Sequence, residues 1–189
     1  MASVGLTIHG KQETFTLLHA MTETSPPAEN DRESVRLRRP EKRDAQSLWR
    51  LVCADETLDT NSCYLYLLQA TEFADSCVVA ELNGEIVGFA TGFRPPTRPQ
   101  SLFVWQVLVA PPARGMGLAK QLLLYLVEQG EAVQFIEATI TPSNVPSRRL
   151  FASLASRLGA VIEYSRRFES ADFGASGHEA EELVRVGPI

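Results

Sequence analysis

A glycine-spaced segment at residues 114–119 carries the residue types best suited to bind an anion. Small residues at a helix start let a ligand approach the backbone closely, and the first-turn N–H groups are free to donate to it. The segment lacks the Gly-Lys-Ser/Thr ending of a P-loop and the three-glycine spacing of a dinucleotide-binding turn. It therefore predicts another kind of phosphate site, made by Arg114, Gly115, Met116, Gly117, Leu118 and Ala119.

Two further places combine carboxylates with other polar groups. Asp59, Asn61 and Tyr64 crowd around an expected helix start, where they form either a plain helix cap or a site that offers a carboxylate to a cationic substrate. Glu137 lies in an otherwise apolar run, which disfavours its charged form unless the carboxylate is paired. It is therefore a candidate catalytic group, an edge-facing residue or the partner of an arginine.

The remaining candidates are two neighbouring residues of an expected strand and a loop near the C-terminus. Trp105 and Gln106 lie on an expected buried strand, and the glutamine indicates that one face of this strand meets something polar. Trp105 is either a core residue or a pocket wall that stacks on an ammonium group. His178 and Glu179 follow a glycine-rich stretch that forms either a solvated loop or a segment that closes over substrate.

A strand, a short break and a helix position the anion site. Residues 102–109 contain no ionisable side chain and are rich in valine and aromatic residues, which predicts a strand covered on both faces. Two consecutive prolines end it. Leu118, Leu122 and Leu126 then recur at helical spacing and predict a helix with one buried face.

The rest of the chain predicts a mixed sheet with helices on its faces. Asn83-Gly84 between two strand-like runs is a strong hairpin signal. The expected order is β-α-α-β-β-β-α-β-α-β-β, an α/β (α+β) fold. Its strands are expected near 35–38, 76–82, 86–93, 102–109, 133–140, 161–168 and 183–186, and its helices near 44–52, 63–68, 118–126 and 146–158.

Length and composition narrow the function classes. The 189 residues, 44% of them hydrophobic and 22% charged, predict one soluble domain. The net charge of −5 argues against nucleic acid or an anionic membrane surface as partner. No apolar run reaches the roughly 18 residues that a membrane span needs, and no signal peptide is recognisable.

The N-terminus and the cysteines carry two further expectations. Residues 1–33 are polar and weakly patterned, which predicts a flexible leader before a single domain at 34–189, with Met21 as an alternative start to Met1. The cysteines are odd in number, three, and show no CxxC spacing, which favours free thiols in the cytoplasm over a metal site or a disulfide.

The segment Arg114-x-x-Gly117-x-Ala119 resembles the acetyl-CoA-binding motif of the GNAT N-acetyltransferases, Arg/Gln-x-x-Gly-x-Gly/Ala. The resemblance covers the chain from about residue 35 onward and implies the GNAT fold, in which the fourth and fifth strands splay apart around the cofactor. It implies that residues 114–119 hold the pyrophosphate. It assigns to the rest of the cofactor Val107, Leu108, Val109, Asn144 and Arg149.

Four stretches around this motif look like one subfamily, the L-2,4-diaminobutyrate acetyltransferases of ectoine biosynthesis. They are residues 58–64 (LDTNSCY), 103–107 (FVWQV), 137–144 (EATITPSN) and 178–188, which begins HE and ends RVGP. The resemblance implies transfer of the acetyl group of acetyl-CoA to the 4-amine of L-2,4-diaminobutyrate, without a metal, in a cytoplasmic homodimer. The substrate would meet Asp59, Asn61, Tyr64, Trp105, Gln106, Glu137, His178 and Glu179.

The proton chemistry departs from the family pattern. Many members use an acid on the fourth strand, and residues 101–109 contain none, so the base is sought among Asp59, Glu137, His178 and Glu179. The usual tyrosine that protonates the thiolate is replaced by Phe151, which leaves Tyr64, water or no donor. The alternatives are therefore an acetyltransferase of another amine or peptide and a catalytically dead acyl-CoA-binding module.

Overall fold

The computed structural model describes residues 35–55, 58–130, 132–174 and 177–189, so the expected leader lies outside the described residues. All of these residues belong to one compact unit, Glu33–Ile189. Its sheet has the strand order β1-β2-β3-β4-β5-β7-β6 within the described part of the chain. The strands are β1 Arg36–Arg38, β2 Val78–Leu82, β3 Glu85–Phe93, β4 Ser101–Val109, β5 Phe135–Ile140, β6 Ile162–Phe168 and β7 Glu181–Val186.

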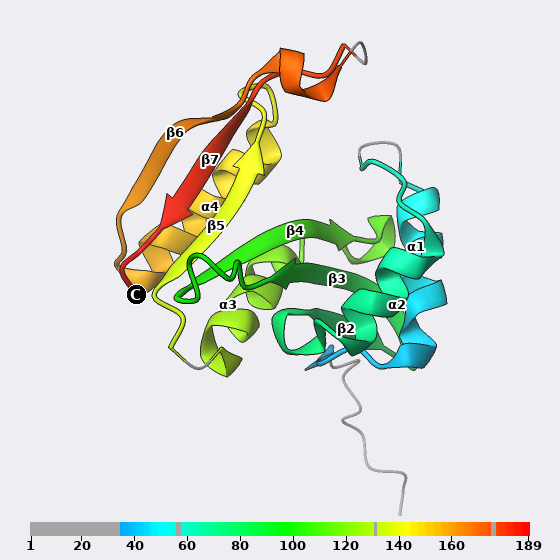
Figure 1. The fold of residues 1–189 in the computed structure, drawn as a ribbon. Helices are drawn as coiled ribbons and strands as arrows, with labels where there is room; N and C mark the ends of the chain where they lie inside the picture. The colour runs from blue at the N-terminus through cyan, green and yellow to red at the C-terminus, as the bar shows by residue number, and fades with distance from the viewer. Residues whose placement is uncertain (1–34, 56–57, 131, 175–176) are drawn as a thin grey trace, which may run out of the picture. The chain divides into compact units, whose positions relative to one another are not determined.

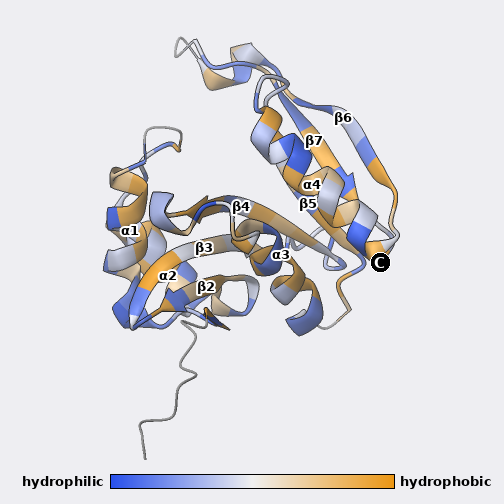
Figure 2. Cartoon of the chain, turned by 180° about the vertical axis from the view of Figure 1, so that it is seen from behind, coloured by the Kyte–Doolittle hydropathy of each residue, from blue (hydrophilic) through white to orange (hydrophobic). Residues whose placement is uncertain are grey.

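Helices cover both faces of this sheet, as expected. The α-helices are α1 Ala45–Cys53, α2 Cys63–Thr71, α3 Leu118–Gln129 and α4 Val145–Leu158. Helices α3 and α4 pack on one face, and α1 and α2 lie on the other (Figures 1 and 2). Short 3-10 turns complete the chain: η1 Lys42–Asp44, η2 Ala74–Ser76, η3 Pro111–Ala113 and η4 Ser170–Phe173.

Each face has its own hydrophobic core. The predicted stripe on α3 is confirmed, because Leu118, Leu122 and Leu126 are all buried against the sheet. On the opposite face, Tyr66 of α2 packs edge-on against Phe89 of β3, with ring centroids 6.4 Å apart. Burial of apolar surface on both faces holds the strands as a rigid platform for the loops at their ends.

The sheet separates between β4 and β5. These two strands are the only parallel neighbours in the described sheet, and they pair at Ser101↔Phe135, Leu102↔Ile136 and Phe103↔Glu137. Beyond that point β4 stays with β3 and β5 stays with β7, so the strands diverge (Figure 1). The expected splay is therefore confirmed, and it leaves a free edge on β4 from residue 104 onward.

A β-bulge marks β4 just past the point of divergence. Thr91 of β3 pairs with Gln106, and the next residue, Gly92, pairs with Val104, so Trp105 is an extra residue in β4. A β-carbon on Gly92 would lie 2.5 Å from the carbonyl oxygen of Phe103, so only glycine allows the strands to approach so closely there. Bulges re-aim side chains, and this one turns Trp105 out of the regular alternation of β4.

The hairpin turn predicted between two of the strands is present. Asn83 and Gly84 both adopt positive φ, as a two-residue hairpin turn requires. Cys53, Cys63 and Cys77 are free thiols, and burial raises the pKa of Cys77 to about 12. None of the helices among the described residues has the length and apolar character to cross a bilayer.

Candidate active site

A cavity of about 800 Å³ opens in the gap between β4 and β5. Its walls come from β4, from β5, from the start of α4, and from the segments before α2, β4 and β7. A second hollow of about 640 Å³ lies over β1, β2 and α1. We take the first as the candidate active site because it is bounded by the free strand edge that leads to the predicted anion site.

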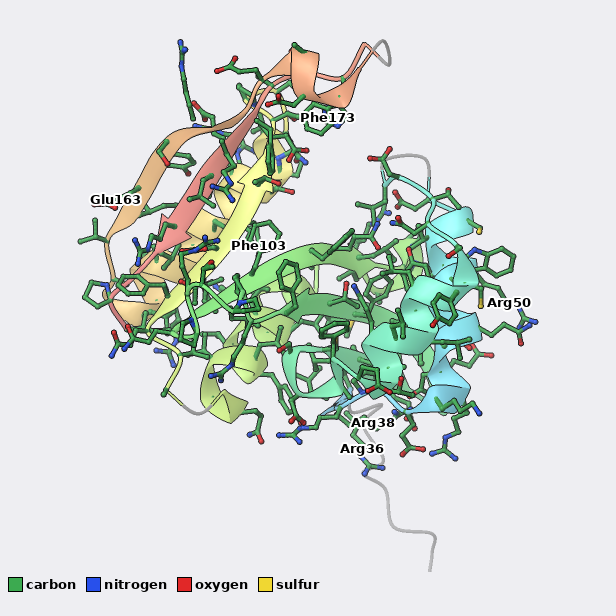
Figure 3. All side chains as sticks on the ribbon, viewed as in Figure 1. Arg36, Arg38, Arg50, Phe103, Glu163 and Phe173 are labelled. Atoms are coloured by element: carbon green, nitrogen blue, oxygen red, sulfur yellow. The ribbon has the colours of Figure 1, made fainter. Side chains whose placement is uncertain are left out.

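Three aromatic side chains form one wall of the cavity. Phe103 lies where β4 and β5 begin to diverge (Figure 3), and its ring centroid is 5.2 Å from that of Phe93. Trp105 meets Phe93 edge-on at 6.0 Å and is 47% exposed, so much of the indole faces the cavity. This arrangement matches the predicted pocket wall, which offers π-faces to a cation.

Gln106 connects the strand to the segment before α2. The buried Tyr66 hydroxyl donates to Gln106 Oε1 at 2.9 Å, and Gln106 Nε2 donates to the backbone carbonyl of Asp59 at 3.1 Å. Burial raises the pKa of Tyr66, although its hydrogen bonds with Asn61 and Gln106 act in the opposite direction. Gln106 thus fixes the backbone of Asp59, whose carboxylate has no hydrogen-bond or ion-pair partner among the described residues and borders the cavity.

Glu137 is buried and fully engaged. Its side chain is 1% exposed and accepts a hydrogen bond from Ser101 Oγ at 2.9 Å. It also pairs with Arg98 Nε at 3.2 Å and with Arg185 Nε at 3.5 Å. It does not line the cavity itself, whereas Arg98 does. Of the roles considered for Glu137, the structure therefore favours pairing with arginine, because its carboxylate is engaged by two guanidinium groups and a hydroxyl and does not reach the cavity.

The loop before β7 places His178 on the cavity wall, with Glu181 as its nearby carboxylate. The imidazole stacks on Phe173 with centroids 4.1 Å apart, and its Nε2 lies 3.7 Å from Glu181 Oε1. Its Nδ1 lies 2.7 Å from the carbonyl oxygen of Glu179; because a carbonyl only accepts, Nδ1 is the protonated nitrogen. The Glu179 carboxylate bonds instead to Ser143 Oγ at 2.7 Å and lies outside the cavity lining, which contains Glu181.

Tyr64 also lies outside the cavity lining. It is 66% exposed on α2, whereas Tyr66, two residues further along the helix, turns inward to Gln106. Adjacent helical positions differ by about 100°, so a shift of two residues moves a side chain to nearly the opposite face of the helix. The structure thus brings Asp59, Asn61, Trp105, Gln106 and His178 together but leaves Glu137, Tyr64 and Glu179 outside the lining.

The glycine-spaced segment forms the start of α3. Gly117 is the N-cap of this helix with φ of +71°, a left-handed conformation that glycine adopts without strain. The helix geometry leaves the N–H groups of Leu118, Ala119 and Lys120 without intrahelical partners, as an anion site requires. Arg114 is 56% exposed at its side chain and pairs with Asp55 at 3.0 Å, so it borders this helix start with its charge partly neutralised.

The start of α4 supplies the other predicted cofactor contacts. Asn144 lines the cavity and caps α4 by accepting from Ser147 N at 3.1 Å. Arg149 is exposed on α4, while Arg148 is engaged with Glu182 at 2.6 Å. Phe151 is buried in the cavity wall and presents no hydroxyl group there. Within the described residues, no group of three or more His, Cys, Asp or Glu side chains is placed to hold a metal ion.

Comparison with known proteins agrees with this geometry. Residues 41–155 match the model of the acetyltransferase (GNAT) family. An L-2,4-diaminobutyric acid acetyltransferase of Virgibacillus pantothenticus is 43% identical over 79% of this chain and 96% of its own length. The homologous enzyme of Streptomyces avermitilis is 43% identical over 83% of this chain and 90% of its own length. The chain belongs to the L-2,4-diaminobutyric acid acetyltransferases of the GNAT family.

Solved structures support the same assignment. Diaminobutyrate acetyltransferase from Paenibacillus lautus, solved with L-2,4-diaminobutyric acid and coenzyme A, has a TM-score of 0.77 and 41% identity. The match covers 82% of this chain and 96% of that one. The GNAT loading domain of CurA from Lyngbya majuscula, at 17% identity and a TM-score of 0.60, shares the fold alone.

Several cavity residues of this diaminobutyrate acetyltransferase were not predicted from its sequence. Arg98 lies in a proline-rich loop, and its charge gave no sign that it would face inward rather than toward solvent. Glu181 lies three residues after His178, in a run of acidic residues where spacing does not single one out. Phe93 ends the hairpin strand as an ordinary apolar residue. Each of the three contacts a predicted residue: Arg98 contacts Glu137, Glu181 lies beside His178, and Phe93 contacts Trp105. Only the fold shows these contacts.

Proposed function

We propose that this diaminobutyrate acetyltransferase transfers the acetyl group of acetyl-CoA to the 4-amino group of L-2,4-diaminobutyrate. The product is 4-N-acetyl-L-2,4-diaminobutyrate, for ectoine biosynthesis and hence osmoprotection. The observation that carries the proposal is that β4 runs from an aromatic and acidic cavity toward the start of α3, whose first N–H groups have no intrahelical partners. The names of the relatives, and the ligands of the Paenibacillus enzyme, support the same pair of substrates.

Acetyl-CoA fits the splay between the strands. Its pyrophosphate would lie on the N–H groups at the start of α3, with Arg114 and Arg149 nearby. Its pantetheine amides would pair with the free edge of β4 at Val107–Val109, and the Asn144 amide would bond to the same arm. The free N–H groups next to the bulge would then stabilise the oxyanion that forms when the thioester is attacked.

The substrate amine must lose a proton before it attacks. His178 would accept this proton at Nε2, which lines the cavity 3.7 Å from Glu181 Oε1. Asp59 would hold the second ammonium group, and Trp105 would cover the cationic chain. Because Phe151 lacks a hydroxyl, the leaving thiolate would take its proton from water or depart unprotonated.

The test is a turnover assay with purified protein, acetyl-CoA and L-2,4-diaminobutyrate. Coenzyme A release is followed, and the product is examined by NMR to distinguish acetylation at N4 from acetylation at N2. We expect turnover at N4, with lysine, ornithine and peptide amines as much poorer substrates. Equal use of all amines, or acetylation at N2, would contradict the proposal.

A second candidate is an acyl-CoA-binding protein without catalysis. The apolar Phe151 in the cavity wall and the lack of an acid on β4 favour it. Calorimetric binding of acetyl-CoA combined with no turnover on any amine would support this candidate and exclude the first.

We also propose that the protein is a cytoplasmic homodimer. The free thiols suit a reducing compartment, and β6, an edge strand of the sheet, exposes Tyr164 and Phe168. Sedimentation equilibrium at micromolar concentration tests the dimer, and a monomer across that range would contradict it. Fractionation of the producing cells tests the compartment.

A further inference from the structure

An excess of positive charge lies at the base of the cavity, where β4 and β5 separate. Glu137 of β5 is paired across the strands with Phe103, the last residue of β4 in register with it. Its carboxylate interacts with both Arg98 and Arg185. Within the described part of the chain, two guanidinium groups thus share one buried carboxylate, so one positive charge has no counter-charge at this point.

Arg98 is the member of this cluster that faces the cavity. Its side chain is 35% exposed and lines the cavity, and its Nε alone contacts Glu137, at 3.2 Å. Among the described residues, its two terminal Nη groups have no hydrogen-bond partner. A guanidinium presents its donors as a planar fork that matches a carboxylate, so Arg98 offers an unused anion-binding face.

The backbone and the buried partner hold Arg98 in this orientation. Its N–H donates to the carbonyl of Pro95 and its carbonyl accepts from Ser101 N, each at 2.9 Å, so the proline-rich loop closes on both sides of it. Ser101 Oγ also orients the Glu137 carboxylate. A side chain held at its backbone and at Nε loses less entropy when it binds a ligand than a freely rotating one does.

The cavity lining also carries the complementary charge. Asp59 and Glu181 line the same cavity as Arg98, together with the aromatic Phe103 and Trp105. The cavity therefore offers a cation for a carboxylate and acidic groups for amines, which are the two kinds of charge that a zwitterionic diamino acid carries.

We propose that Arg98 binds the α-carboxylate of the substrate amino acid and that Glu137 is the positioning residue that holds the Arg98 guanidinium toward it. The proposal rests on the proposed function and adds the specificity determinant to it. An α,ω-diamine without a carboxylate reacts at the same catalytic groups but gains nothing from Arg98. Arg98 therefore selects amino acids over polyamines.

The competing cation in the cavity is Arg167 of β6. Its guanidinium lies over the ring of Phe168 at 5.3 Å and, among the described residues, forms no ion pair with a carboxylate. It stands on an exposed edge strand, where water screens its charge. Arg167 is thus the matched control for Arg98, because it is a cavity arginine without a buried carboxylate partner among the described residues.

The experiment compares L-2,4-diaminobutyrate with 1,3-diaminopropane, which is the same chain without the carboxylate. The full-length wild type, Arg98→Gln, Arg98→Lys and Arg167→Gln are assayed for kcat/KM on each amine and for the KM of acetyl-CoA. We expect Arg98→Gln to lower kcat/KM about 100-fold for diaminobutyrate, as loss of a bidentate charge pair does, and to leave diaminopropane within about twofold. Arg98→Lys should fall between, and Arg167→Gln should keep the wild-type preference.

Glu137→Gln tests the positioning role. It should raise the KM for diaminobutyrate and reduce the preference over diaminopropane, while kcat for diaminopropane stays near the wild-type value. Retained turnover of diaminopropane shows that a variant is folded. If a glutamine variant does not fold, Arg98→Lys still tests the proposal.

Three outcomes overturn the Arg98 proposal: an unchanged preference in Arg98→Gln, an equal loss on both amines, or loss of preference in Arg167→Gln instead. Failure of the proposed function is distinguishable from these, because the wild type itself would then show no turnover of diaminobutyrate.

Discussion

At the scale of single residues, Trp105 owes its place in the cavity to one extra residue in β4. Without the bulge, the regular alternation of β4 would give Trp105 and Gln106 opposite faces of the sheet. With it, Trp105 contacts Phe93 while Gln106 bonds to Tyr66 and Asp59 on the α1–α2 side. Both polar recognition and the aromatic wall therefore depend on a single irregularity of the backbone.

Trp105→Ala should weaken binding of the amine and leave the cofactor nearly unaffected. A desolvated cation–π contact contributes about 2 kcal/mol, so we expect the KM for diaminobutyrate to rise at least about tenfold. The KM for acetyl-CoA should change by less than about twofold, because the indole packs against Phe93 in the amine pocket rather than at the phosphate site. Steady-state kinetics with each substrate varied in turn measures both values, and Trp105→Phe, which keeps a ring, should lose less. Equal increases in both KM values would contradict this role.

The sequence predicted the roles of some site residues better than those of others, and the reason is physical. Asp59, Trp105 and His178 were found from sequence because polar or aromatic groups stood out against their neighbours, and all three line the cavity. Glu137 stood out for the same reason, yet its neighbours in space are Arg98 and Arg185, 39 and 48 positions away in the chain. Whether a buried carboxylate is a base or half of an ion pair depends on such distant partners, which spacing along the chain does not show.

At the scale of elements, an ion-pair network ties β1 to the start of α1. Arg38 donates to Asp44 Oδ2 at 2.6 Å and to Glu81 of β2 at 2.7 Å, and Asp44 also accepts from the backbone N–H of Glu41. Burial alone would raise the pKa of Asp44, but these hydrogen bonds outweigh it and hold the pKa below its ordinary value. The network therefore stabilises the fold only while the Asp44 carboxylate is charged.

Asp44→Asn should lower the free energy of unfolding by about 2–3 kcal/mol at neutral pH, the usual worth of hydrogen bonds to a charged group in a partly buried site. A lowered folded-state pKa means that the contribution is complete above the unfolded-state pKa of about 3.9 and is lost as pH falls through the folded-state value. The difference from wild type should thus persist down to about pH 5 and shrink below about pH 4. Urea unfolding at several pH values measures it. Asp75→Asn, which breaks the exposed Arg39 pair, is the control and should change stability little.

Gly117→Ala should affect both stability and cofactor binding. Its φ of +71° costs an alanine roughly 1–2 kcal/mol, and relief of this strain would move the N–H groups at the start of α3. We expect a lower melting temperature together with a higher KM for acetyl-CoA. Gly159→Ala is the control, because Gly159 ends α4 with a similar φ of +64° and does not line the cavity. This variant should lower the melting temperature without changing the KM for acetyl-CoA. A cofactor KM that rises equally in both variants would contradict the anion-site role of Gly117.

Elements were predictable where their signals are local. The stripe on α3, the Asn83-Gly84 turn and the strand–helix alternation depend on neighbouring residues, and the structure confirms each of them. The placement of β7 between β5 and β6 was not expected, because strand order is decided by packing of the whole sheet. The bulge at Trp105 was missed for the same reason: it is a mismatch between two strands rather than a property of one.

At the scale of the whole molecule, the sheet consists of two well-packed parts that meet only at the first three residue pairs of β4 and β5. The free edge of β4 lacks the ladder hydrogen bonds that protect its other edge, so its outward amides are open to exchange with solvent. A cofactor that pairs with this edge would take the place of a neighbouring strand. The backbone hydrogen bonds that the open edge lacks would then form only in the bound state.

Acetyl-CoA should therefore protect this edge selectively in hydrogen–deuterium exchange. We expect slower exchange in peptides that cover residues 104–109 and 115–120, with no change in the β2–β3 hairpin, which is already paired on both sides. At 100 times its dissociation constant, the ligand should also stabilise the fold by about 2.7 kcal/mol, visible as a higher melting temperature. Diaminobutyrate alone should protect the segments around Asp59, Arg98 and His178 instead, because its amines and its carboxylate would contact these residues. Uniform slowing across the sheet with acetyl-CoA would mean that the molecule tightens globally, and the free edge of β4 would then have no special part in binding.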